Sequence, residues 1–219
     1  MGKTVELTAS DGHHPCAYRA EPNDKPRGAI VVVQEIFGVT HHIRAVVDQY
    51  AAAGFTSIAP ALFDRVEPNV DVPYGNSGHA FAYVKKLTDD QVVRDLQAAV
   101  EAVASAGKVG MVGYCWGGAM TYLAAARLKL AAAIAYYGGG IQAYLDEKPR
   151  CPVMFHYGEL DTHIPLATVE LVKEAVPEGH FFLYPAGHGF NCADRASFDG
   201  TCAKLALDRS LEFLHRYVG

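Results

Sequence analysis

Lys108-Val109-Gly110-Met111-Val112-Gly113-Tyr114-Cys115-Trp116-Gly117-Gly118 is the stretch that decides the fold of this chain. A short apolar run leads into Gly-Tyr-Cys-Trp-Gly, and a helix-like segment follows it. The pattern predicts a nucleophile elbow, which is a sharp strand-to-helix turn, with cysteine in the place of serine. Glycines two residues before and two residues after Cys115 remove the Cβ atoms that would clash across such a turn.

The predicted elbow holds the Cys115 thiol out of the sheet, over the N-terminus of a helix. Unpaired N–H groups and peptide dipoles at that terminus favour negative charge, so they can lower a thiol pKa from about 8.5 and stabilise an oxyanion. We therefore expect a reactive thiol at this position. The alternative is that Cys115 is a small buried hydrophobic side chain, as free cysteines often are.

Length and composition favour one soluble domain. The chain has 219 residues, 50% of them hydrophobic, so it can bury a sizeable core, and we expect a single α/β domain over residues 1–219. The formal net charge of −5 argues against nucleic acid or an anionic membrane as a partner. The first residues lack the apolar run of a signal peptide, and no segment approaches the roughly 20 apolar residues that span a bilayer. We expect a cytoplasmic monomer or small homo-oligomer.

The five cysteines, at positions 16, 115, 151, 192 and 202, are an odd number without Cys-x-x-Cys spacing. Such a set is typical of reduced thiols and not of a disulfide framework or a zinc site. The histidine spacing does not form a persuasive metal cluster either. The sequence therefore predicts no metal site and leaves a thiol free for chemistry.

Strand-like and helix-like stretches alternate along the chain. The expected strands cover residues 29–33, 55–59, 108–112, 131–135, 153–156 and 180–184. Apolar residues at helical spacing predict a helix that Thr40 caps and Gly54 ends, another that starts near residue 89, and a closing helix with Leu207, Leu211 and Leu214 facing inward. Because parallel neighbours need crossover connections, this alternation predicts an α/β fold with a doubly wound, mostly parallel sheet flanked by helices. The segment 66–86 is a long connection with Pro and Gly, of the kind that forms a lid or a binding loop.

A nucleophilic Cys115 needs a base and a group that orients the base. In the chain order nucleophile, acid, histidine, Asp161 and His188 each follow a predicted strand and fall in a loop at the carboxyl edge of the sheet. They are the candidate acid and base. Asp161 has an alternative role as a helix N-cap or turn residue. His163 lies close enough to Asp161 in sequence to compete with His188.

The oxyanion hole of this architecture takes one N–H from the residue after the nucleophile, here Trp116. The second comes from the loop after an early strand, where Ile36 is the candidate. Glu35 in that loop follows a strand of only Ala, Ile and Val, apart from the adjacent Gln. Burial beside the thiol would raise the pKa of Glu35 and make it a proton partner for Cys115. The alternative is an exposed loop carboxylate.

Together, five blocks of sequence resemble the dienelactone hydrolases, also called carboxymethylenebutenolidases, which have the α/β-hydrolase fold. The blocks are Gln34-Glu35-Ile36-Phe37-Gly38-Val39, Gly113-Tyr114-Cys115-Trp116-Gly117-Gly118, Tyr136-Tyr137-Gly138, Gly158 with Asp161 and Pro165, and Gly187-His188-Gly189-Phe190. The resemblance implies a triad of Cys115, Asp161 and His188, with the amides of Trp116 and Ile36 as the oxyanion hole. It also implies that Glu35 holds the resting thiol and takes its proton when substrate binds.

The mechanism that the resemblance implies is attack of the Cys115 thiolate on a lactone or ester carbonyl, followed by hydrolysis of an acyl-enzyme with help from His188. It needs no metal and no organic cofactor. The expected partner is therefore a small-molecule ester or lactone. As residues that contact this substrate we expect Tyr137, Phe37, His79 and Arg195.

The chain departs from the family pattern at the substrate. Family members that act on dienelactone hold its carboxylate with two arginines, one in the lid region and one four residues after the catalytic histidine. Here the second position is Cys192, and no arginine lies between Val66 and Val93. We expect a substrate other than the usual dienelactone, or a carboxylate held by Arg195, His79 or Lys85. Arg65 is the other arginine near these segments in sequence.

Two other functions fit the same sequence. A thioesterase or acyltransferase on this scaffold would act on thioesters in preference to lactones. A catalytically silent domain would bind a small molecule or a partner, although a binding module has no physical need for nucleophile, acid, base and oxyanion loop together.

Overall fold

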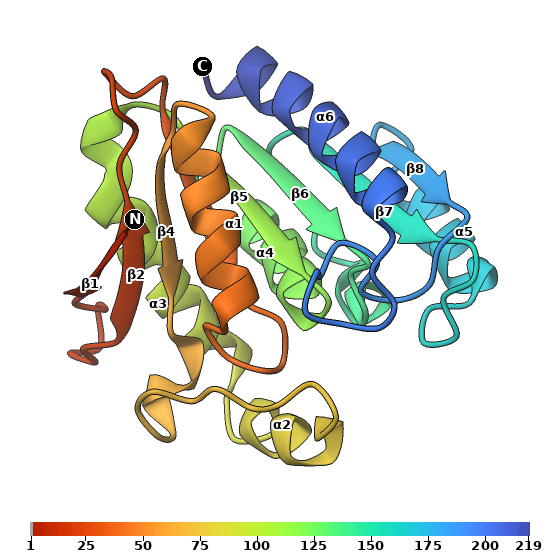
Figure 1. Ribbon diagram of the computed structural model, residues 1–219, viewed down its shortest axis with the longest axis horizontal. Helices are drawn as coiled ribbons and strands as arrows, with labels where there is room; N and C mark the ends of the chain where they lie inside the picture. The colour runs from red at the N-terminus through yellow and green to blue at the C-terminus, as the bar shows by residue number, and fades with distance from the viewer. Residues whose placement is uncertain (1) are drawn as a thin grey trace.

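The computed structural model describes residues 2–219. One eight-stranded sheet runs through it in the order β1-β2-β4-β3-β5-β6-β7-β8, as Figure 1 shows. The strands are β1 (Lys3–Glu6), β2 (Cys16–Ala20), β3 (Ala29–Val33), β4 (Thr56–Pro60), β5 (Val109–Tyr114), β6 (Ala132–Tyr136), β7 (Val153–Gly158) and β8 (His180–Tyr184). Neighbours from β4 to β8 pair in parallel, whereas β2 is antiparallel to both β1 and β4. The predicted mostly parallel sheet is confirmed.

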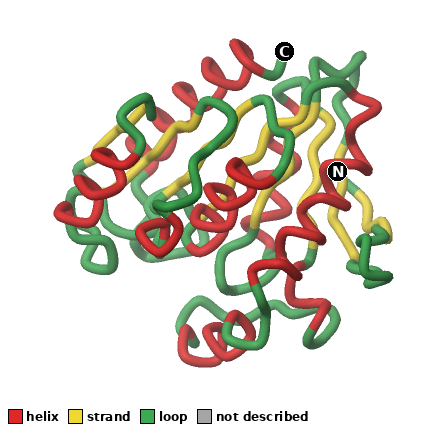
Figure 2. The backbone as a smooth tube through the Cα atoms, turned by 180° about the vertical axis from the view of Figure 1, so that it is seen from behind, coloured by secondary structure: helices red, strands yellow, loops and turns green. Residues whose placement is uncertain are grey.

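Helices cover both faces of this sheet. They are α1 (His41–Ala52), α2 (Ser77–Val84), α3 (Asp89–Val103), α4 (Trp116–Arg127), α5 (Leu166–Ala175) and α6 (Gly200–Tyr217), with short 3-10 turns η1 (Leu62–Arg65), η2 (Ala104–Ala106) and η3 (Ile141–Tyr144). Helices α1 and α6 lie in front of the sheet in Figure 1, and the view from behind in Figure 2 shows helices on the other face too. Helix α2 stands apart, beyond the carboxyl ends of the strands.

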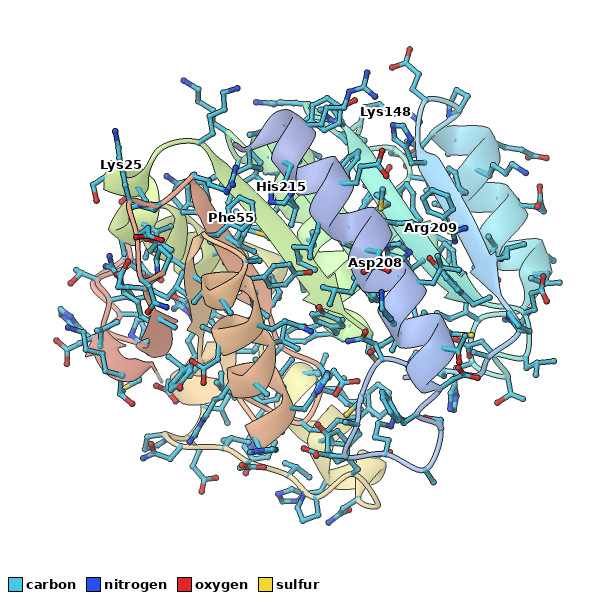
Figure 3. All side chains as sticks on the ribbon, turned by 45° about the horizontal axis from the view of Figure 1, so that its top comes forward. Lys25, Phe55, Lys148, Asp208, Arg209 and His215 are labelled. Atoms are coloured by element: carbon cyan, nitrogen blue, oxygen red, sulfur yellow. The ribbon has the colours of Figure 1, made fainter. Side chains whose placement is uncertain are left out.

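The central strands are buried along their whole length because both faces are covered. Every residue of β3, β5 and β6 is buried. On the front face, α6 makes two ring contacts. His215 stacks on Phe55 at 5.6 Å, as the labels in Figure 3 let the reader follow, and the Arg209 guanidinium lies 4.2 Å from the ring centre of Phe182 in β8.

Most element positions agree with the sequence predictions. Thr40 caps α1 by accepting a hydrogen bond from the N–H of Ile43, and α3 begins at Asp89. The prediction that three leucines of the closing helix face inward is confirmed, because Leu214 is fully buried and Leu207 and Leu211 are partly buried and pack against the core. The buried face of α6 also includes Ala206, Ser210 and Phe213.

The segment 66–86, predicted as a loop, contains helix α2. A second hydrophobic cluster ties this segment to the rest of the molecule through Phe63, Val72, Ala80 and Tyr83, which pack with Ile36 and Phe37 from the loop after β3. In addition, the N–H of Val72 donates to the carbonyl of Phe37 at 2.9 Å. The segment is therefore anchored beside the loop that carries Glu35.

Among residues 2–219, the structure has no helix with both the length and the apolar character that a membrane crossing requires.

Arg65 forms ion pairs away from the predicted substrate site. Its guanidinium forms two 2.7 Å hydrogen bonds with the carboxylate of Asp95 and two more, of 2.9 and 3.1 Å, with Asp11. Asp95 is fully buried, and burial raises its pKa while Arg65 opposes that shift. Through Asp95 and Asp11, Arg65 joins η1 to α3 and to the β1–β2 connection. These ion pairs hold the chain in place where it leads into α2.

Replacing Arg65 with methionine should lower the free energy of unfolding by about 3–5 kcal/mol, because a buried carboxylate loses its charged partner. Urea unfolding followed by circular dichroism measures this change. The exposed pair Lys204–Asp208 provides the control, since Lys204→Ala should change stability very little. Equal effects of the two substitutions would contradict the role given to Arg65.

Candidate active site

Cys115 sits in the turn between β5 and α4, with φ 55° and ψ −123°. A positive φ is strained for any residue but glycine, and such strain is found at functional sites where the surroundings impose it. A Cβ at Gly113 would overlap the carbonyl oxygen of Gly117, and a Cβ at Gly117 would overlap that of Gln34. The glycines therefore have the steric role that the sequence predicted.

Three side chains form a continuous hydrogen-bonded chain at this turn. His188 Nε2 lies 3.1 Å from Cys115 Sγ, and His188 Nδ1 lies 2.7 Å from Asp161 Oδ2. Asp161 follows β7 and His188 follows β8, and both strands end at the same edge of the sheet as β5. The structure thus brings together the nucleophile, acid and histidine that the sequence suggested.

The Asp161 carboxylate is oriented by its own loop. Its Oδ1 accepts hydrogen bonds from the backbone N–H groups of His163 (2.8 Å) and Ile164 (3.1 Å), while Oδ2 faces His188. Burial alone would raise the pKa of Asp161, but the hydrogen bonds from His188 and the two amides outweigh it and hold the pKa below its usual value. Asp161 therefore stays charged, and it pairs with His188 and not with the side chain of His163.

The resting thiol differs from the sequence-based expectation. Burial, and next the charge of Glu35, raise the pKa of Cys115 to about 12, although the Trp116 backbone N–H acts in the opposite direction. The helix N-terminus is present, but removal of water from the sulfur is the larger effect. These effects together favour the neutral thiol over the thiolate at rest.

Glu35 is fully buried, and burial raises its pKa to about 7 despite the opposing charge of Arg195. Its Oε1 lies 3.4 Å from Arg195 Nη1, and among the described residues its Oε2 has no hydrogen-bond partner. The raised pKa and the burial agree with the prediction. The contact does not, because Glu35 faces Arg195 while the Cys115 thiol faces His188.

A cavity of about 410 Å³ opens above the thiol. Its apolar wall is made of Ile36, Phe37, Phe81, Trp116 and Ile164. The polar groups that reach it are Cys115, His163, His188, Arg195 and Ser77. Both residues predicted for the oxyanion hole, Trp116 and Ile36, therefore border the same cavity as Cys115.

The residues expected to contact substrate divide into two groups. Phe37 and Arg195 line the cavity. His79 and Lys85 are exposed and do not line it, because α2 turns Ser77 and Phe81 toward the cavity instead. Ser77 and Phe81 are four residues apart, on one helix face. Neither residue was predicted to lie at the site, because the segment 66–86 was expected to be a loop.

Tyr137 also lies outside the cavity lining. It is fully buried, and its ring packs edge-to-face on His188 with 5.1 Å between centroids. It is therefore placed beneath the histidine and not against a substrate. Between residues 2 and 219, no group of three or more His, Cys, Asp or Glu side chains is arranged to hold a metal ion.

A mostly parallel eight-stranded sheet with a strained elbow after β5, an acid after β7 and a histidine after β8 defines an α/β hydrolase. Comparison with known proteins narrows this class. The family model of the dienelactone hydrolases matches residues 16–218. The chain therefore belongs to the dienelactone hydrolase family, and it is a hydrolase.

Individual relatives agree with this assignment. Carboxymethylenebutenolidase 1 of Cupriavidus pinatubonensis is 32% identical over 222 residues, covering 96% of this chain and 95% of the relative. Carboxymethylenebutenolidase of Pseudomonas putida is 32% identical over 224 residues, with 96% and 94% covered. A crystal structure of a Klebsiella pneumoniae protein assigned as a dienelactone hydrolase superposes with a TM-score of 0.87 at 32% identity, over 99% of this chain and 100% of the other.

Proposed function

We propose that this protein hydrolyses a lactone or carboxylic ester through an acyl-enzyme intermediate on Cys115. The observation that carries the proposal is the 3.1 Å contact between His188 Nε2 and Cys115 Sγ, made at a strained turn that borders a cavity. A sulfur nucleophile, a base within hydrogen-bond reach and an acid that orients the base are the components of nucleophilic acyl transfer.

In the first half of the reaction, Sγ attacks the substrate carbonyl carbon while its proton moves to His188 Nε2. The transfer accompanies the attack because the raised thiol pKa leaves little thiolate at rest. Asp161 stabilises the imidazolium that forms, and the amides of Trp116 and Ile36 are the proposed donors to the oxyanion. The C–O bond then breaks, the leaving oxygen takes the proton from His188, and a thioester remains on Cys115.

In the second half, water attacks the thioester carbonyl and gives a proton to His188 Nε2. The tetrahedral species collapses, the C–S bond breaks, and the sulfur recovers the proton from His188. The products are a carboxylic acid and the alcohol or enol of the leaving group. Apart from the substrate and water, this scheme uses only side chains and backbone amides of the chain itself.

The ion pair of Arg195 and Glu35 affects which substrates the cavity can bind. Arg195 is the one arginine that borders the cavity within residues 2–219, and it is already paired with Glu35. Its guanidinium also lies 5.8 Å from the ring centre of Phe37 and 5.7 Å from that of Tyr74. A substrate carboxylate must therefore share this arginine with a buried acid, whereas a neutral ester meets a mostly apolar wall.

A substrate screen tests this reading. We expect neutral aromatic and short-chain esters to be hydrolysed with kcat/KM at least equal to that of dienelactone, because one shared arginine replaces the two that hold its carboxylate in the family. Thioesters with the same acyl groups should be no better substrates than the esters. Rapid hydrolysis of dienelactone with none of neutral esters would contradict the reading. A strong preference for thioesters would favour the thioesterase alternative.

A further inference from the structure

Tyr137 stands beside the nucleophile in the sheet. Residue Tyr136 at the end of β6 pairs in register with Tyr114 at the end of β5, so the next residues, Tyr137 and Cys115, leave the sheet side by side. The carbonyl of Tyr136 accepts a hydrogen bond from the N–H of Cys115 at 3.0 Å. The N–H of Tyr137 in turn donates to the carbonyl of His156 at 2.7 Å.

The backbone of Tyr137 is strained in the same way as that of Cys115. Its φ is 38°, and the non-glycine residues with positive φ between residues 2 and 219 are Asn69, Cys115 and Tyr137. A bulky aromatic residue is a rare occupant of this region, and the conformation persists only where surrounding structure imposes it. The two strained residues that lie at strand ends are thus the nucleophile and its neighbour.

The strained backbone directs the Tyr137 ring against the catalytic histidine. The ring is fully buried and contacts His188 edge-to-face at 5.1 Å and Phe190 edge-to-face at 5.4 Å. His188 has a second ring neighbour in His163, also 5.1 Å away, but His163 is exposed at the cavity. The imidazole therefore has one buried ring partner, Tyr137, and one exposed ring partner, His163.

We infer that Tyr137 is a positioning residue, whose buried ring holds the imidazole of His188 in line with Cys115 and Asp161. The inference rests on the proposed function, in which His188 is the base. The aromatic ring, and not the hydroxyl, positions His188. The ring contacts the imidazole, whereas the buried hydroxyl has no hydrogen-bond partner among the described residues. The Phe variant should therefore keep the function that the Leu variant loses.

The test compares Tyr137→Leu with Tyr137→Phe. The Leu variant should lose at least about tenfold in kcat with KM changed less than threefold, because small misplacements of catalytic groups mainly affect the chemical step. The Phe variant should stay within about threefold of the wild-type kcat. The rate of Cys115 alkylation by iodoacetamide, read from the mass of its peptide, should fall in parallel in the Leu variant, since thiolate formation depends on His188.

Tyr157 supplies the matched control. Within residues 2–219 it is equally buried, its hydroxyl also has no hydrogen-bond partner, and its ring stacks on Phe155 and forms no ring pair with His188. Tyr157→Leu should therefore lower the melting temperature about as much as Tyr137→Leu while leaving kcat and the alkylation rate unchanged. The inference is overturned if the two Leu variants have the same kcat. Full turnover by a Cys115→Ala variant would instead overturn the proposed function, so the two failures are distinguishable.

Discussion

Replacing Cys115 with alanine is expected to reduce turnover of every ester substrate at least about 10³-fold while leaving the fold intact. The alanine variant has no atom that can form the acyl intermediate, and only the binding cavity and oxyanion donors remain to assist hydrolysis by water. The sulfur borders a cavity, so its removal leaves little unfilled space in the core. Initial rates with an activated ester, together with a urea unfolding curve, measure both parts of this expectation.

Replacing Cys115 with serine provides the sharper control. A serine hydroxyl is far less acidic than a thiol, and His188 Nε2 is placed here at 3.1 Å from a sulfur atom. We expect a large loss of rate, although the shape of the side chain hardly changes. Unimpaired activity of the serine variant would contradict the sulfur-based mechanism. Cys202→Ser is a suitable comparison, because Cys202 is buried in the first turn of α6 and does not line the cavity, so this variant should keep the wild-type rate.

Replacing Asp161 with asparagine is expected to lower kcat by about 10³- to 10⁴-fold. The carboxylate accepts the Nδ1–H of His188 and so leaves Nε2 free to take the thiol proton, whereas an asparagine amide can donate to Nδ1 and favour the wrong tautomer. The amide oxygen can still accept from His163 and Ile164, so the loop should keep its shape. Stopped-flow measurement of the acylation step detects this loss directly.

Glu159 gives the matched control for Asp161. It is an exposed acid in the same loop, and its backbone N–H donates to the carbonyl of Tyr184. Glu159→Gln removes one negative charge from the loop without touching the triad, so kcat should change less than twofold. If Asp161→Asn were as active as Glu159→Gln, the acid would not orient His188, and the assigned roles would be wrong.

The sequence predicted much of this site because the relevant signals are local. The Gly-x-Cys-x-Gly spacing around Cys115 reflects steric limits at the turn, because a Cβ at Gly113 would overlap the carbonyl oxygen of Gly117 and a Cβ at Gly117 would overlap that of Gln34. Asp161 and His188 could be predicted because each follows a strand whose carboxyl end lies at the same sheet edge. The burial of Glu35 followed from the apolar strand before it.

The features of the site that were not predicted depend on contacts between distant parts of the chain, which local sequence patterns do not show. The thiol pKa is set by burial and by Glu35 in the loop after β3, and these outweigh the N–H of Trp116 at the helix terminus. Helix α2 was not predicted because it is only eight residues long and lies in a segment with Pro and Gly. The positions of Ser77 and Phe81 at the cavity were therefore not predicted either. The expected contact of Tyr137 with substrate was not found, because its ring packs against His188. No local sequence pattern shows the positive φ that Tyr137 adopts.

The most direct test of the central claim is the mass of the enzyme quenched during turnover of a slowly hydrolysed ester. A covalent intermediate predicts an added acyl mass that maps to the peptide containing Cys115, appears with the burst of released alcohol and disappears as the acid forms. The same mass should be absent from the Cys115→Ala variant. Continued hydrolysis with no acyl group on that peptide, or with the acyl group on another residue, would contradict the account.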